Sequence, residues 1–256
     1  MERNMEPRYS SLQNAIRLLN TFTIDEPELG ISSLAERLGL AKSTVHRLVT
    51  SLAQEGFIAK DVNTNLYRLG ISILERGNVV TSTMKIYQAA LPVLHDLGKL
   101  VNESVHFGIF REDKVVFINR IDSSRSITSL SIMGSQVPAH CTSSGLVFLA
   151  YQPKETVDRI IRKGLTAYTE KTITDPQRLY QVLETVRKQG YAVSIEEYQK
   201  GVASVAAPIL NAQGKAIASV STPGPVNRMP KETIAQIAKY VTRAAQEISR
   251  RHIQGS

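Results

Sequence analysis

The sequence contains few of the features that mark secreted, zinc-stabilised or membrane-spanning proteins. Its 256 residues include one cysteine, Cys141, which excludes an internal disulfide framework and any zinc site made of several cysteines. The longest apolar runs, such as 203–210, fall far below the roughly 20 residues of a spanning helix. The first ten residues, MERNMEPRYS, lack the apolar core of a signal peptide. We therefore expect a cytoplasmic protein without a membrane partner.

Catalytic signatures are equally scarce. Neither a glycine-rich phosphate loop nor a metal-ligand spacing is present. His140 and Cys141 could form a nucleophile pair, with His106 on a predicted strand nearby, but adjacent residues rarely point at each other and no third, orienting group is apparent. Glu196 and Glu197 are successive and therefore face opposite sides of a strand. We expect no enzyme activity and no cofactor.

The net charge of +8 does not by itself indicate a nucleic-acid partner. Residues 1–76 hold nine basic and nine acidic residues, so the basic excess lies in the remainder of the chain. Local placement matters more than the sum. Lys42, Arg47, Lys60 and Arg68 can share one face, and that placement favours a DNA contact.

Residues 31–57, ISSLAERLGLAKSTVHRLVTSLAQEGF, are typical of two short helices joined by a tight turn. The first helix runs from about Ser32 to Leu38, and Gly39 suits the sharply turned backbone that ends it. Small Ala35 lets the second helix cross closely on its apolar stripe. The polar residues left outside near the start of the second helix are Lys42, Ser43, Thr44, His46, Arg47 and Thr50. Such a helix reads the major groove of DNA; the alternative is an ordinary helical hairpin.

The next segment is typical of a wing. Residues 57–70, FIAKDVNTNLYRLG, offer two short apolar segments around a turn where Asn and Asp tolerate the backbone conformation. In a winged helix the hairpin tip lies near the adjacent groove or backbone. We therefore expect such contacts from Asn63, Thr64, Asn65 and Arg68. The alternative is a hairpin that only packs the helices.

Two further helices are predicted around this unit. The first begins after Ser10 or Ser11, and the residues expected on its buried face are Leu12, Ala15, Ile16, Leu19 and Phe22. The second covers 71–90, with an apolar stripe through Leu74, Val80 and Met84. Because the small domain offers little core for that stripe, we expect a dimer interface. The alternative is a linker helix packed on the larger domain.

The length of the chain favours a small domain followed by a larger one. Strand-like runs in the larger part lie at 103–110, 114–122, 126–133, 190–199, 201–210 and 215–222, and helical runs lie at 92–102, 145–151, 154–162, 175–189 and 230–252. Most strand connections are hairpins. This order predicts an α+β domain built on an antiparallel sheet, with helices segregated to a face.

Eight segments carry a family resemblance. In order they are SLQNAIRLLNTF, SLAERLGLAKSTVHRLVTSLAQEGFI, YRLG, PVLHDL, ESVHFGIF, VPAHCTSSG, GYAVSIEEYQKGVASVAAPIL and STPGPVNR. The ordered set resembles an IclR-type transcriptional regulator over nearly the whole chain. The resemblance implies a winged helix-turn-helix domain over 1–70, a linker helix over 71–90 and a GAF-like effector-binding domain over 91–256. It also implies homodimers, often paired into homotetramers, that bind double-stranded operator DNA as repressors or activators.

The resemblance also implies an effector pocket. In the family, backbone amides before the helix at 145–151 hold a small carboxylate, and here these belong to Ser143 and Ser144, at the positive end of the helix dipole. The further polar and apolar contacts that it implies are Ser194, Ser204, Ser221, Leu130, Ile132, Val137 and Val202. Ser194 replaces a frequent acid, Ser204 stands where some relatives have Cys, and Pro223 occupies an often polar position.

A larger or more neutral ligand therefore stays open, and the serines could also be plain turn and strand-end residues. We expect a sequence-specific DNA-binding regulator, most simply a repressor, whose operator affinity changes when a small organic acid binds. The alternative is a small-molecule sensor or scaffold that does not bind DNA.

Overall fold

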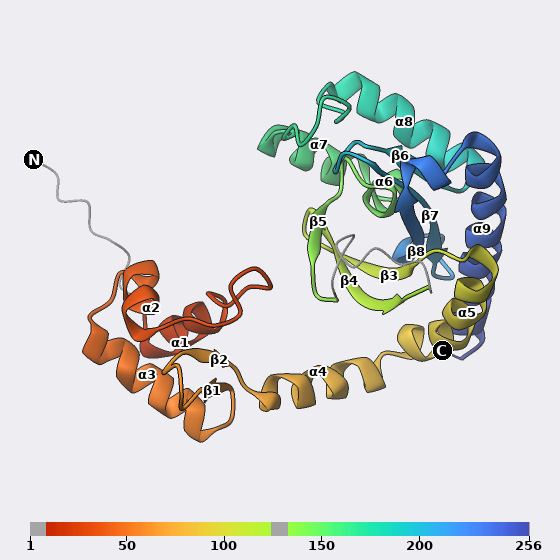
Figure 1. The fold of residues 1–256 in the computed structure, drawn as a ribbon. Helices are drawn as coiled ribbons and strands as arrows, with labels where there is room; N and C mark the ends of the chain where they lie inside the picture. Colours follow the sequence, from red (N-terminus) through yellow and green to blue (C-terminus); the bar gives the residue numbers. More distant parts are fainter. Residues whose placement is uncertain (1–8, 124–132, 256) are drawn as a thin grey trace, which may run out of the picture. The chain divides into compact units, whose positions relative to one another are not determined.

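The computed structural model describes residues 9–123 and 133–255, in two compact units that meet between Met84 and Lys85 (Figure 1). Two predicted ligand contacts, Leu130 and Ile132, and most of the strand expected at 126–133 lie outside the described residues. Within those ranges, no helix combines the length and the apolar character that a bilayer crossing requires.

The first unit contains α1 (Ser11–Leu19), α2 (Ile31–Leu38), α3 (Lys42–Gln54), the hairpin β1 (Ile58–Lys60) and β2 (Tyr67–Leu69), and α4 (Ile71–Thr83). Gly39 ends α2 in the left-handed conformation, with φ of 66°. The Leu40 amide then donates to the Ala35 carbonyl at 3.0 Å, which closes the helix end and turns the chain into α3. Residues from α2, α3 and β2 form one buried cluster. The expected winged helix-turn-helix is confirmed.

Helix α1 keeps only part of its predicted buried face: Ala15 and Leu19, with Phe22 just after the helix, pack in the cluster of the first unit. Leu12 is 71% exposed and Ile16 is 51% exposed, whereas Asn14 and Leu18 are buried, so the prediction was wrong for Leu12 and Ile16. Asn14 is tolerated inside because its amide nitrogen donates to the Tyr9 carbonyl at 3.2 Å and its side-chain oxygen accepts from Arg17 at 3.0 Å. A polar residue with local hydrogen-bond partners, Asn14, is therefore buried where the apolar pattern alone predicts leucine or isoleucine.

The helix expected over 71–90 is two helices, α4 and α5 (Lys85–Val101), separated by the extended residue Met84. The end of α4 is rich in hydroxyl and β-branched residues. Thr81 and Thr83 turn their hydroxyls back to carbonyls of the preceding turn, at 3.0–3.2 Å, and such bonds compete with regular helix geometry. Helix α5 then continues through Pro92, which was expected to start it.

The described strands of the second unit form a six-stranded antiparallel sheet in the order β5-β4-β3-β8-β7-β6. The strands are β3 (Val105–Arg111), β4 (Lys114–Ile121), β5 (Gln136–Pro138), β6 (Ala192–Ile195), β7 (Val202–Leu210) and β8 (Ala216–Pro225). The helices are α5, α6 (Ser143–Ala150), α7 (Lys154–Lys163), α8 (Pro176–Gln189), the short 3-10 helix η1 (Val226–Arg228) and α9 (Lys231–Gln254). The predicted α+β class is confirmed.

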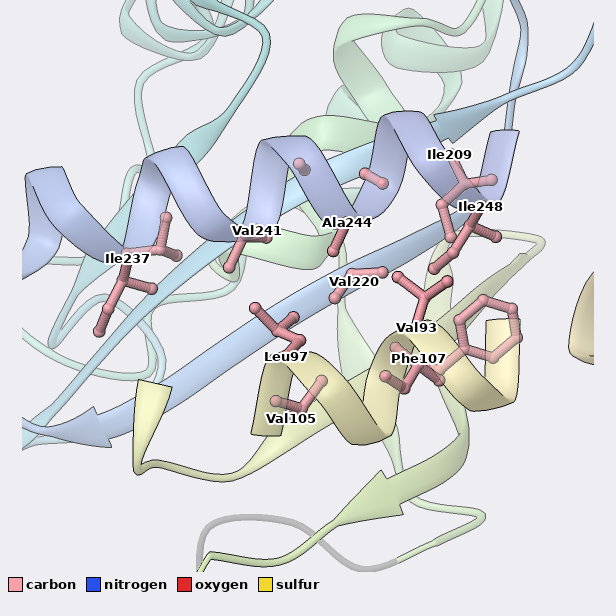
Figure 2. Packing of buried hydrophobic residues seen from close by; sticks show 14 of the residues in the cluster. Val93, Leu97, Val105, Phe107, Ile209, Val220, Ile237, Val241, Ala244 and Ile248 are labelled. Carbon is pink, nitrogen blue, oxygen red and sulfur yellow. The ribbon is translucent and has the colours of Figure 1, made fainter. Parts of the chain in front are cut away.

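Helices cover both faces of this sheet, where the sequence led us to expect one covered face. Helices α5 and α9 pack on the side that holds Phe107, Val205 and Val220, as Figure 2 shows for α5, α9 and the strands below them. Helices α6, α7 and α8 pack with Ala192 and Ala206 on the other side. Strand β7 is accordingly buried along most of its length, which explains its nearly unbroken apolar sequence.

Candidate DNA interface and ligand cavity

The start of α3 presents the predicted DNA-contacting side chains to solvent. Lys42, Ser43, His46 and Arg47 are exposed and Thr44 is half-buried. The buried side chains of the same helix are Val45, Leu48 and Val49. Among the residues that the structure describes, the cationic groups of Lys42 and Arg47 have no hydrogen-bond or ion-pair partner. Both charges are therefore available to an external anion such as a phosphate.

The hydroxyl of Thr50 is already engaged, since it donates to the His46 carbonyl at 2.8 Å. Helix α3 starts after Ala41, whose side chain offers no cap. The amides of Lys42 and Ser43, in its first turn, have no partner inside the helix, as at any helix start. A phosphate near this end would gain from the helix dipole as well as from Lys42.

The wing has a well-defined tip. The Asp61 carboxylate accepts the amides of Asn63 and Thr64, each at 2.9 Å, and these bonds hold the Asp61 pKa below its usual value. Asn65 takes a left-handed backbone conformation with φ of 58°. Asn63 and Asn65 are exposed. Val62, which sequence reasoning did not single out, is 84% exposed beside them.

The cations of the wing are less available than those of α3. The Arg68 guanidinium lies 3.5 Å from the Glu28 carboxylate, and the Lys60 ammonium lies 5.7 Å from the centre of the Tyr67 ring. An exposed ion pair of this length is weak, so Arg68 could still exchange Glu28 for a phosphate. The wing therefore offers mainly amide and apolar groups at its tip, and a partly neutralised charge at its base.

A cavity of about 60 Å³ lies in the second unit, between the start of α6 and one face of the sheet. Seven of the nine residues predicted to contact a ligand line it, and they are Val137, Ser143, Ser144, Ser194, Val202, Ser204 and Ser221. Strand register brings them together: Ser194 pairs with Ser204, and Ser221 pairs with His106 on the neighbouring strand. Residues 61 positions apart, such as Ser143 and Ser204, thereby come within a 2.8 Å hydrogen bond.

The start of α6 forms one wall. Thr142 caps the helix by accepting the Gly145 amide at 3.2 Å, and its hydroxyl donates to the Pro138 carbonyl at 2.8 Å. The amides of Ser143 and Ser144 take part in none of the described hydrogen bonds. The Ser144 hydroxyl is buried and has no partner in the described part of the chain. The wall thus keeps two amides and one hydroxyl unused beside the cavity.

Gly145 makes this arrangement possible. A Cβ atom at that position would lie 2.2 Å from the Ala139 backbone, well inside van der Waals contact. Only glycine lets α6 approach the strand-end segment so closely. The approach places the helix start against the cavity rather than in solvent.

Seven lining residues were absent from the predicted ligand contacts: His106, Phe117, Cys141, Thr142, Tyr198, Gln199 and Pro223. His106 lies on β3 with its ring 4.9 Å from that of Phe117. Burial and the nearby Arg120 charge lower the pKa of His106 to about 3, so its imidazole is neutral. Alternation along β3 places His106 and Gly108 on one face of the strand, but the pairing of Gly108 with Phe117 and of His106 with Ser221 depends on strand register.

Tyr198 and Gln199 enter the cavity wall from the segment after β6. Threonine hydroxyls hold this segment: Thr169 donates to the Glu196 carbonyl and Thr172 donates to the Glu197 carbonyl, both at 2.6 Å. The Tyr168 ring meets the Tyr198 ring edge to face at 5.0 Å. The segment is therefore fixed from outside by the loop before α8.

None of the described lining side chains carries a charge at neutral pH. Burial raises the pKa of the Cys141 thiol to about 12, and His106 is neutral. Glu197 does not line the cavity, and burial raises its pKa to about 7. One Glu197 carboxyl oxygen is buried and has no partner among the described residues. The cavity thus offers hydroxyls, amides and a helix dipole to a ligand.

The same geometry gives no support to Cys/His catalysis. The Cys141 thiol is fully buried and stays protonated, whereas a nucleophile needs the thiolate. The His140 ring is engaged elsewhere, with Nε2 3.0 Å from the Thr166 carbonyl oxygen. Among residues 9–123 and 133–255, no three His, Cys, Asp or Glu side chains gather as metal ligands would.

Two family descriptions match this chain. Residues 11–62 match the "IclR helix-turn-helix domain", and residues 78–250 match "Bacterial transcriptional regulator IclR C-terminal". The chain is 32% identical to the glycerol operon regulatory protein of Streptomyces coelicolor, over 91% of this chain and 89% of that protein. It is 29% identical to the HTH-type transcriptional regulator XynR of Escherichia coli, over 95% and 97% of the two chains.

A solved structure shares the fold. It is an IclR homologue from Microbacterium hydrocarbonoxydans complexed with 4-hydroxybenzoate, with a TM-score of 0.85 and 25% identity, covering 96% of this chain and all of that one. The matches confirm a DNA-binding regulator with a C-terminal effector-binding domain, and they identify a family of regulators rather than enzymes. The chain belongs to the IclR family of bacterial transcriptional regulators.

Proposed function

We propose that this regulator lowers its affinity for operator DNA, or raises it, when a small organic acid binds in the cavity at the start of α6. One observation carries the proposal: the buried hydroxyl of Ser144 and the unused amides of Ser143 and Ser144 converge on an uncharged cavity. A carboxylate would satisfy all three donors and gain from the helix dipole. Repression, relieved by the acid, is the simplest mode.

The size and polarity of the cavity limit which acids can bind in it. The cavity volume of about 60 Å³ is well below the range of typical ligand pockets, so the proposed acid is small. The serines opposite α6, Ser204 and Ser221, suit a hydroxyl or carbonyl on the same molecule. The complex of the Microbacterium homologue with 4-hydroxybenzoate is consistent with an acid that also carries an oxygen at its far end.

The ligand proposal is tested by screening small organic acids for thermal stabilisation of the full chain. A ligand at about 100 times its Kd stabilises the folded state by about 2.7 kcal/mol. Ser144→Ala should weaken binding of each hit roughly fivefold, because one hydrogen bond contributes about 1 kcal/mol. Ser219→Ala is the matched control: its hydroxyl is also buried and unpartnered among the described residues, but it does not line the cavity. Equal affinities in both variants would reject the proposed site.

For DNA, we propose that α3 enters the major groove with Lys42, Ser43, Thr44, His46 and Arg47, while Asn63, Asn65 and Arg68 of the wing follow the neighbouring backbone or minor groove. The available charges of Lys42 and Arg47 support this assignment. A gel shift on the chain's own upstream DNA, repeated at several salt concentrations, tests it against a sensor that does not bind DNA. Such a regulator works in the cytoplasm, where the operator is.

We further propose that the working unit is a homodimer joined in part through α4, and that two such dimers can pair into a dimer of dimers. Helix α4 has no buried residue, and its Leu74, Val79 and Val80 are more than half exposed. Exposed apolar side chains on a helix that buries none of its residues favour contact with another apolar surface. In this proposal residues 1–70 bind DNA, α4 connects, and the ligand-binding domain that was expected from residue 91 begins at Lys85.

A further inference from the structure

A second cavity, of about 550 Å³, lies between the end of α6 and the helices α7 and α8. Its volume falls in the range of small-molecule sites, and it shares no lining residue with the cavity at the start of α6. The residues that line it are Leu149, Gln152, Lys154, Val157, Tyr180, Gln181, Leu183, Glu184 and Arg187. This surface is concave and lined by residues of three helices and the segment after α6, which suits a small ligand better than a flat protein partner.

The floor of the second cavity is aliphatic. Leu149 comes from α6, Val157 from α7 and Leu183 from α8, and each is at most 3% exposed. The three side chains belong to one packed cluster, so the floor is rigid. An apolar ligand body resting on it would be removed from water at little cost in protein reorganisation.

Two residues of α8 define the length of the cavity. At one end the Tyr180 hydroxyl donates to the Asp158 carboxylate of α7. At the other end the Nε of Arg187 donates to the Ala150 carbonyl, the last residue of α6, at 2.8 Å. Arg187 lies seven positions after Tyr180 on the helix, which corresponds to a rise of about 10 Å. A medium-chain or single-ring molecule fits that span.

The charges at the Arg187 end are positive. With Nε bound to Ala150, the two terminal amino groups of Arg187 have no described partner, and neither has the ammonium of Lys154. The acid on the rim, Glu184, is already paired with Lys188 at 2.7 Å. A guanidinium that is held by a backbone carbonyl keeps its fork oriented, and such a fork matches a carboxylate. Lys215 lines an adjoining hollow that also contains Arg187.

We propose that the second cavity binds an amphipathic monocarboxylate, with its apolar body on Leu149, Val157 and Leu183 and its carboxylate on Arg187 and Lys154. The two cavities then lie at opposite ends of α6, whose eight residues span about 12 Å. Ser144 at one end faces the first ligand, and Ala150 at the other end anchors Arg187. Any coupling between the two ligands through this helix is reciprocal.

Octanoate is the probe, because its length matches the cavity, and octan-1-ol is its uncharged counterpart. Binding to the full chain is measured by titration calorimetry in a Ser144→Val background, which blocks the first cavity. Octanoate should bind more tightly than octan-1-ol. Arg187→Gln should weaken octanoate binding at least tenfold and remove its advantage over the alcohol. Arg159→Gln, on the exposed face of α7 outside the cavity, should leave the affinity unchanged.

Because Arg187→Gln also removes the bond to Ala150, Lys154→Gln is measured in parallel; Lys154 has no described bond to lose and should still weaken binding severalfold. Circular dichroism melting confirms that each variant is folded. Three results would each overturn the proposal. They are no octanoate binding at millimolar concentration, binding that disappears with Ser144→Val alone, and Arg187→Gln and Lys154→Gln variants that are folded and bind octanoate as tightly as their Ser144→Val parent. A change in oligomeric mass with Arg187→Gln would also overturn it, since the cavity would then be a contact between copies of the chain.

Discussion

Arg47 and Glu197 show how single side chains can be assigned by asking which groups lack a partner. Arg47 is exposed with an unpaired charge on a rigid helix. Glu197 is partly buried, with one carboxyl oxygen left without a described partner. An exposed charge such as that of Arg47 is solvated by water and is available to an external anion. A buried oxygen without a partner, such as that of Glu197, lowers the stability of the folded state. Each leads to a measurable expectation.

Arg47→Ala should weaken specific operator binding by about 1 to 3 kcal/mol if the guanidinium reads a base edge, and Lys42→Ala should lower the salt slope by about one unit. Quantitative gel shifts at several salt concentrations measure both effects. Arg37→Ala is the control, because Arg37 is exposed in the same unit but its charge is already paired with Glu26. If Arg47→Ala behaves like Arg37→Ala, α3 does not read the operator through Arg47.

The raised pKa of Glu197 predicts a dependence of stability on pH. Its pKa is about 7 in the folded chain, because of burial, against 4.5 for an unperturbed carboxyl. Between these values the folded state holds a proton that the unfolded state has released, so the Glu197 contribution to stability falls as pH rises from about 4.5 to about 7 and is then flat. Glu197→Gln should remove this slope.

The measurement is urea unfolding of the wild type and of Glu197→Gln from pH 5 to pH 8. The difference between the two should grow to about 2 kcal/mol in favour of the variant above pH 7. The groups around Glu197 that also respond to charge are Cys141, whose pKa it raises, and Arg178, which opposes the shift; both are retained in the variant. If the free energies of unfolding of the two proteins changed with pH in parallel, the Glu197 carboxyl would be solvated by water and its pKa would not be raised.

At the scale of helices and strands, local patterns predicted what local forces decide. Gly39 and the buried Ala35 of the helix-turn-helix follow from turn chemistry and a 3.6-residue period, and both lie where the sequence analysis expected them. On α1 the prediction was wrong for Leu12 and Ile16, which are exposed, while Asn14 is buried because its amide finds partners in Tyr9 and Arg17. Hydrogen bonds of that kind are not visible in an apolar pattern.

The residues that line the ligand cavity also fall into those that local patterns predict and those that they do not. Ser143 and Ser144 begin α6, earlier than the helix expected from residue 145, and could be chosen from the family resemblance and the helix dipole together. His106 and Tyr198 could not, since the first depends on the register between β3 and β8 and the second on threonines of a distant loop. The break at Met84 was missed because hydroxyl and β-branched residues weaken a helix only by small, summed preferences.

The exposed apolar residues of α4 lead to a prediction about dimer formation. Val80 is 58% exposed, so Val80→Glu should leave the folding of each unit intact while placing a charge on the proposed dimer contact. Sedimentation analysis should then show dissociation or a lower association constant, and Ser82→Glu, another exposed position of α4, is the control. An unchanged mass for Val80→Glu at all concentrations would place the dimer contact elsewhere.

For the whole molecule, regulation requires only that the ligand bind two arrangements of the chain unequally. A coupling of about 1 to 3 kcal/mol changes operator affinity by roughly 5- to 150-fold. The same factor must appear when operator DNA is added and ligand affinity is measured. This reciprocity is tested by titrating operator DNA with and without one screened acid, and by titrating the acid with and without operator DNA. An acid whose affinity does not change at saturating operator concentration would not be the effector.

Hydrogen peroxide and electrophiles modify thiols that are accessible and ionised. Cys141 is neither, because it is fully buried and its pKa is about 12. Cys141 lines the proposed ligand cavity, but its thiol offers no oxidisable trigger there. We therefore expect binding in this cavity to be unchanged after treatment of the folded chain with hydrogen peroxide.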